Sequence, residues 1–174
     1  IIKQWRAASP AITKFWWDVD RAANKALDTG KMQTAGRLKI GYYDHKLFIC
    51  LPSGRKLAYI EPEKRLNSFN RMELTYMGVG KTRKWERIMT YGPKLVENCI
   101  QAIARDILAE AMLRVDATGF DIVAHVHDEM IVEVPNGKSS VKELCDMMAE
   151  SPDWVDDKLP LRADGYECEW YRKD

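Results

Sequence analysis

The chain has 174 residues, of which 46% are hydrophobic and 30% are charged, and its formal net charge is +1. This composition is typical of a globular protein with one hydrophobic core, and it excludes a disordered chain. The near-zero charge argues against a free-standing nucleic-acid-binding protein, because such proteins usually carry a basic excess. Any surface that contacts DNA must therefore be local.

No apolar run approaches the roughly 20 residues that a transmembrane helix needs, so we expect no membrane partner. The N-terminus lacks both an initiating Met and the pattern of a signal peptide, which indicates a piece of a longer protein. Four cysteines lie far apart and form no Cys-x-x-Cys pair; they are Cys50, Cys99, Cys145 and Cys168. We therefore expect reduced thiols and a cytoplasmic location.

Three segments precede the strongest signals. Residues 1–27 carry apolar side chains at spacings of three, four and seven, which predicts helix with a break near Ser9-Pro10. Residues 36–60 alternate between turn residues and predict a small β-meander. Residues 61–76 show little periodicity, and we expect an irregular loop there.

A basic segment follows at residues 81–94, KTRKWERIMTYGPK, in which five cations accompany one acid, Glu86. The cations are Lys81, Arg83, Lys84, Arg87 and Lys94. The segment is therefore locally basic, although the net charge of the whole chain is close to zero. The pattern fits a surface that contacts a polyanion, and it fits a solvated face without a partner equally well.

The strongest helical signal covers residues 93–118, with Pro93 at its start and Gly119 after its end. At ~100° per residue, one face is apolar and comprises Leu95, Val96, Cys99, Ile100, Ile103, Ile107 and Ala111. A second line of residues, Asp106, Glu110 and Arg114, is spaced by four, and we expect these side chains to pair along the helix surface.

The side of this helix opposite the apolar face carries hydrogen-bond donors. Lys94, Asn98, Gln101 and Arg105 fall within a sector roughly 60° wide, because their spacings are four, three and four. Two cations and two amides with no carboxylate among them suit phosphate oxygens and base edges. A merely solvated face is the alternative.

Residues 120–135, FDIVAHVHDEMIVEVP, predict two strands joined by a tight turn at or near Asp128-Glu129. His127 then lies at the tip with both carboxylates. The flanks are apolar enough to be deeply packed, and carboxylates at the end of a buried hairpin need a cation, which a divalent metal would supply. A solvated acidic turn is the alternative interpretation.

Several motifs resemble family A DNA polymerases, the group that includes bacterial DNA polymerase I and many phage replicases. VHDEMIVEVP, residues 126–135, is similar to motif C, and residues 90–112 resemble the helix before it in phage-type members. Residues 5–23 and 159–174 are similar to the same subgroup, and the pieces occur in the family's order. The resemblance implies an α+β fold: residues 1–174 form one C-terminal palm fragment, in which the hairpin packs on helix 93–118, with a helix at 140–149 and a tail to 174.

The resemblance also implies a catalytic role for the hairpin, template-directed nucleotidyl transfer by a two-metal mechanism. Asp128 matches the motif C aspartate that binds the catalytic Mg²⁺ ions, and Glu129 matches its neighbouring carboxylate. His127 matches a residue beside the primer-terminal nucleotide. The expected partners are primer-template DNA and a deoxynucleoside triphosphate.

DNA contacts follow from the same resemblance. Gln101 matches a glutamine that contacts the duplex minor groove near the primer end. Asn98 is a weaker match, because bacterial members often have asparagine four residues before that glutamine, where this chain has Glu97. Lys94 and Arg105 are extrapolated from the helix geometry.

Two parts of the family pattern have no match here. Motif A would supply the other essential carboxylate, and neither Asp18-Val19-Asp20 nor Asp44 is a convincing substitute. Motif B would hold the triphosphate with an Arg and a Lys; Arg83, Arg87 and Tyr91 imitate its spacing without that Lys. We therefore expect a fragment that is inactive without an upstream palm-and-fingers segment.

Two other functions stay open. A non-catalytic DNA-binding or assembly subunit would bind primer-template DNA in a salt-dependent way without turnover. A metallohydrolase would use His125, His127 and Asp128, because strand alternation turns the two histidines to one face, with His45 as the remaining histidine. Stoichiometric zinc binding would distinguish the metallohydrolase from the polymerase fragment and from the DNA-binding subunit.

Overall fold

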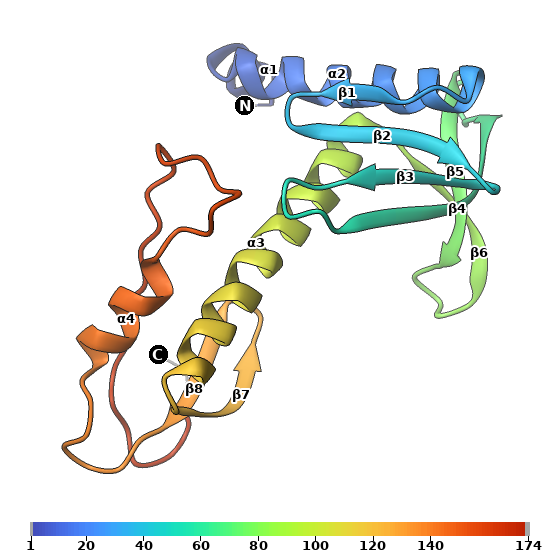
Figure 1. Ribbon diagram of the computed structural model, residues 1–174. Coiled ribbons are helices and arrows are strands. Elements are labelled where there is room, and N and C mark those ends of the chain that lie inside the picture. The colour runs from blue at the N-terminus through green and yellow to red at the C-terminus, as the bar shows by residue number, and fades with distance from the viewer. Residues whose placement is uncertain (1, 173–174) are drawn as a thin grey trace. The chain divides into compact units, whose positions relative to one another are not determined.

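The computed structural model describes residues 2–172, which form helices and two antiparallel sheets, an α+β arrangement (Figure 1). The chain folds as two compact units, residues 1–101 and 102–174. Helix α3 (Gly92–Ala117) begins in the first unit and ends in the second. Within residues 2–172, no helix combines the length and apolar character needed to span a membrane.

The first unit begins with α1 (Ile2–Ala8) and α2 (Pro10–Thr29), so the helix predicted for residues 1–27 is observed over residues 2–27 with its break, and residue 1 lies outside the described residues. Pro10 has no backbone N–H and a fixed φ, which suits the first position of α2. Gly30 ends α2 at φ 64°, and its N–H donates to the Ala26 carbonyl at 2.9 Å. The buried face of α2 consists of Val19, Ala22, Ala23 and Ala26.

A six-stranded sheet completes the first unit, with each strand antiparallel to the one before it. Its strands are β1 (Gln33–Ala35), β2 (Leu38–Tyr43), β3 (Lys46–Cys50), β4 (Lys56–Leu66), β5 (Met72–Val79) and β6 (Trp85–Thr90). Helix α2 lies along β1 and β2 (Figure 1). The fully buried side chains of this unit include Ile40, Leu47 and Ile49 from the sheet and Leu95 and Cys99 from α3.

The loop predicted at residues 61–76 is wrong, because β4 extends to Leu66 and β5 starts at Met72. The pairing register of these strands shifts between Ile60 and Glu63, which disrupts the alternation that would reveal a strand. Thr75 also hides the strand pattern, because this polar residue is fully buried. Its hydroxyl donates to the Glu63 carbonyl at 3.0 Å.

The second unit contains the end of α3, the hairpin of β7 (Asp121–Val126) and β8 (Glu129–Glu133), and α4 (Val141–Ala149). The Ser140 hydroxyl caps α4 by accepting the Glu143 N–H at 3.2 Å. Buried residues of this unit include Leu108, Ala111, Val115 and Val155.

The surface pairing predicted for Glu110 and Arg114 is wrong, because both side chains bind the segment that follows the hairpin. Arg114 donates to the carbonyls of Met147 at 3.3 Å and Glu150 at 2.6 Å, and it pairs with the Glu150 carboxylate at 3.1 Å. Glu110 accepts a hydrogen bond from the Trp154 indole. A cation at the C-terminal end of α4 also interacts favourably with the helix dipole.

Candidate functional site

The hairpin tip is a two-residue turn formed by His127 and Asp128. Val126 pairs with Glu129 across the strands, so the turn lies one residue before Asp128-Glu129. His127 has φ 53°, in the left-handed region, where histidine is among the better tolerated residues other than glycine. A positive φ at the first turn residue matches the twist of the strands, at a cost of about 1 kcal/mol.

The expected deep packing of this hairpin is wrong. No residue of β7 or β8 is buried, and Val123 is 52% exposed. In the described part of this unit, the hairpin is a separate two-stranded sheet, and strand side chains are buried only where another layer covers a face of the sheet. Asp128 and Glu129 are exposed, so they do not need a cation to offset desolvation.

The carboxylates at the tip fit Mg²⁺ in type and fall short in number. Asp128 and Glu129 supply the oxygen ligands that Mg²⁺ prefers. In the described chain, residues 2–172, no group of three or more His, Cys, Asp or Glu side chains could hold a metal ion. Glu129 also accepts a hydrogen bond from the Tyr171 hydroxyl at 3.3 Å. Desolvation and then the Glu129 charge raise the pKa of Tyr171.

The structure gives different surroundings to the three α3 donors in the first unit. Lys94 pairs with Glu97 at 3.0 Å. Asn98 is half-buried, and its amide donates to the Tyr59 hydroxyl at 3.2 Å. Burial of Tyr59 raises the pKa of its hydroxyl above its usual range, although the Asn98 hydrogen bond opposes this. The Gln101 side chain is exposed, so its amide is accessible to a ligand.

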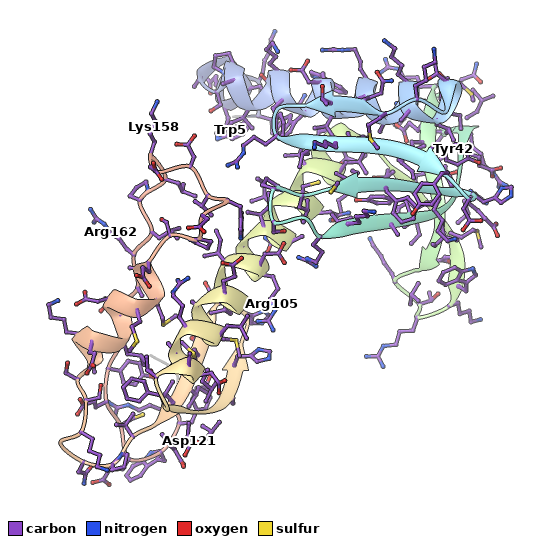
Figure 2. The ribbon with its side chains drawn as sticks, viewed as in Figure 1. Trp5, Tyr42, Arg105, Asp121, Lys158 and Arg162 are labelled. Carbon is purple, nitrogen blue, oxygen red and sulfur yellow. The ribbon has the colours of Figure 1, made fainter. Side chains whose placement is uncertain are left out.

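Arg105 lies in the second unit, where its guanidinium is 3.3 Å from the Nε2 atom of His125 (Figure 2). The guanidinium has donors and no acceptor, so Arg105 would be the donor in this contact. The metallohydrolase would need His125, His127 and Asp128 as ligands, and no group of three or more His, Cys, Asp or Glu side chains within residues 2–172 could hold a metal ion.

The upstream aspartates considered as motif A substitutes have structural partners. Asp18 pairs with Lys14 at 2.6 Å and with Arg21, and the Lys14 hydrogen bond lowers its pKa. Asp44 lies in the β2–β3 turn and pairs with Lys46, whose hydrogen bond lowers its pKa.

Asp20 has a role that the sequence pattern did not indicate. Its carboxylate accepts the Gly92 N–H at the start of α3, at 2.8 Å, and Asn24 donates to it at 3.2 Å. Burial raises the pKa of Asp20, although the Gly92 hydrogen bond opposes this. Because these residues are 72 positions apart, no local pattern could have found the contact.

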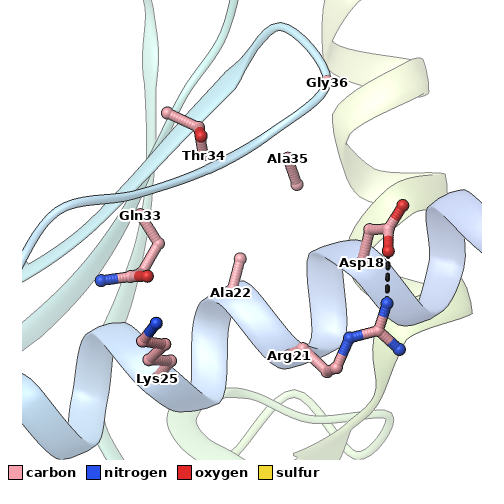
Figure 3. A pocket seen from close by; sticks show the side chains of 8 residues that line it. All are labelled: Asp18, Arg21, Ala22, Lys25, Gln33, Thr34, Ala35 and Gly36. Atoms are coloured by element: carbon pink, nitrogen blue, oxygen red, sulfur yellow. Dashed lines mark hydrogen bonds and ion pairs between the residues drawn. The ribbon is translucent and has the colours of Figure 1, made fainter.

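An open cleft of about 390 Å³ lies between α2 and β1 in the first unit (Figure 3). Its polar lining includes Asp18, Arg21, Lys25 and Thr34. Asp18 and Arg21 neutralise one another there. None of the residues expected to bind metal or DNA lines this cleft.

Comparison with known proteins gives one relative that matches the whole chain. The chain is 44% identical over 176 aligned residues to a DNA polymerase of Bacillus phage SP02, and it spans 27% of the length of that protein. No protein-family model matches the chain, and no solved structure matches it. The chain is thus similar throughout to part of a phage DNA polymerase.

Proposed function

We propose that the chain is the C-terminal palm portion of a family A DNA polymerase and contributes motif C to template-directed DNA synthesis. The observation that carries this proposal is the 44% identity to a phage DNA polymerase over the whole chain. The position of His127 and Asp128 in the tight turn of a hairpin supports it further, because such a turn presents both side chains to a ligand.

In this function, the primer 3′-hydroxyl attacks the α-phosphate of a deoxynucleoside triphosphate and displaces pyrophosphate. Two Mg²⁺ ions would stabilise the charge that develops on the entering and leaving oxygens. Asp128 and Glu129 are the residues of this chain that would hold them, and His127 would lie beside the primer end. A further carboxylate, from outside these 174 residues, would complete the site.

The exposed donors of α3 support a DNA contact. The Gln101 amide can donate to the acceptor atoms that every base pair presents in the minor groove. Arg105 is also exposed, and its charge suits a phosphate. Lys94 and Asn98 would first have to release Glu97 and Tyr59, so we assign them a smaller share of the DNA contact.

A chimeric polymerase tests this proposal. These 174 residues replace the matching region of the Bacillus phage SP02 DNA polymerase, and primer extension is measured with Mg²⁺. We expect activity in the chimera and none in the 174-residue chain alone. Asp128→Ala should reduce the rate by about 10³-fold or more, because a metal ligand contributes several kcal/mol. The matched control is Asp121→Ala, which removes an exposed carboxylate at the other end of β7.

Two results would contradict the proposal. Extension by the isolated chain that depends on Asp128 would show that no further carboxylate is required. A chimera that is folded and binds primer-template DNA without extending it would favour the non-catalytic DNA-binding subunit.

A further inference from the structure

The hairpin between β5 and β6 carries cations that have no ion-pair partner. Lys81, Arg83 and Lys84 are exposed, and none of the ion pairs or side-chain hydrogen bonds within residues 2–172 involves them. The other two cations of the basic segment are paired. Arg87 contacts Glu63 at 2.9 Å, and Lys94 contacts Glu97 at 3.0 Å.

The loop that presents these cations has a defined backbone. The Gly80 N–H donates to the Lys84 carbonyl at 2.8 Å, and the Arg83 N–H donates to the Gly80 carbonyl at 3.0 Å. Arg83 has φ 60°, the left-handed residue that such a loop requires. Because the loop is closed by backbone hydrogen bonds, the three cations gather at one end of the hairpin.

An exposed indole follows the cations in the sequence, at the first residue of β6. Trp85 is 60% exposed and pairs across the strands with Val79, which is 65% exposed. Most tryptophans bury their rings, because the indole has a large apolar surface. The end of this hairpin therefore combines an exposed aromatic ring with three exposed cations.

We propose that this tip, residues 80–85, binds single-stranded nucleic acid, with the cations on the phosphates and an unpaired base stacked on Trp85. A single strand offers regularly spaced phosphates for the cations and unpaired base faces for the indole, so one ligand can contact both. A duplex would leave Trp85 uncovered, because its bases are already stacked. The tip needs neither Asp128 nor Mg²⁺, so it is a contact beyond the proposed polymerase site.

The test measures binding of a labelled oligodeoxythymidine of about 15 nucleotides by fluorescence anisotropy. The buffer contains EDTA, and the salt concentration is varied from about 0.05 to 0.3 M. The variant Lys81→Ala/Arg83→Ala/Lys84→Ala should bind on the order of 100-fold more weakly at about 0.1 M salt, and its salt dependence should be shallower by about 2 logarithmic units per decade. Trp85→Ala should bind about tenfold more weakly with unchanged salt dependence, whereas Trp85→Phe keeps most of the affinity.

The matched control is Lys31→Ala/Lys39→Ala/Arg71→Ala, which removes the same charge from exposed positions away from the tip. An equal loss in this control would overturn the proposal, because net charge alone would then explain binding. It would also be overturned by duplex DNA that binds as tightly as the single strand, or by binding to phosphatidylserine vesicles alone. The binding assay contains EDTA and no deoxynucleoside triphosphate, so a negative result for the tip does not affect the primer-extension test.

Discussion

Among the glycines of residues 2–172, Gly92 is the one where an added methyl group would meet backbone atoms, so it should be strongly destabilising there. A Cβ atom at this position would lie 2.2 Å from the Trp16 carbonyl oxygen, 2.9 Å from its carbonyl carbon and 3.0 Å from the Asp20 Cβ. The first two are backbone atoms of α2, which cannot move away by changing rotamer. Gly92→Ala must therefore push the start of α3 away from α2.

Two energetic costs set the expected decrease in the free energy of unfolding. Overpacking of a tight contact costs about 1–3 kcal/mol. The same displacement stretches the hydrogen bond from the Gly92 N–H to the Asp20 carboxylate, now 2.8 Å, and a bond to a charged group contributes about 1.5–3 kcal/mol. We therefore expect Gly92→Ala to lower the free energy of unfolding by about 3–5 kcal/mol, a large share of the 5–15 kcal/mol typical of a domain.

Urea unfolding followed by tryptophan fluorescence measures this change, because Trp16 is part of the contact. The control is Gly30→Ala, where φ is 64° and no atom lies within 4 Å of the added Cβ. That variant has only left-handed strain, worth about 1 kcal/mol. If Gly92→Ala is no less stable than Gly30→Ala, the contact between α2 and α3 is looser than the structure indicates.

Two further predictions concern single side chains. The pKa of Asp20 is raised from 3.8 in the fold, so the folded state binds more protons and stability should fall as pH rises from about 3.8 through the raised value. Urea unfolding at several pH values should show no such fall for Asp20→Asn, whose stability should stay within about 1 kcal/mol of the parent at pH 7. Asp20→Ala leaves the Gly92 N–H without its acceptor and should cost about 1–3 kcal/mol. Equal costs for the two variants would contradict the hydrogen bond from Gly92 to Asp20. Arg114→Met should speed hydrogen exchange in α4 more than in the first-unit sheet, because α4 loses its bonds to Arg114; unchanged exchange would show that other contacts hold α4.

The helices could be predicted from the sequence because their signals are local. The break at Pro10, the end of α2 at Gly30 and the cap at Ser140 each depend on a few neighbouring residues. The strands after residue 60 could not, since a register shift and the buried Thr75 remove the alternation from the sequence. The contact between Asp20 and Gly92 depends on chain segments that meet only after folding.

The candidate site shows the same limit. Helix geometry predicts Lys94, Asn98 and Gln101 on one side of α3, but it does not reveal which residues contact each of them. Asn98 donates to the Tyr59 hydroxyl, which is 39 residues earlier, and this contact could not be read from the helix pattern. The hairpin was located by its pattern, whereas its exposure depends on which other segments cover it.

The exposure of Asp128 determines how the proposed metal site is made. Mg²⁺ holds its water ligands strongly and requires near-octahedral oxygen geometry, so two exposed carboxylates of one hairpin bind it weakly. Additional ligands from another segment would bring the missing oxygens and would also exclude water from the tip, which strengthens every charge interaction there. In the proposed polymerase, high metal affinity is therefore a property of the assembled palm. In this proposal, the chain would contribute the fixed turn that holds Asp128 ready for that assembly.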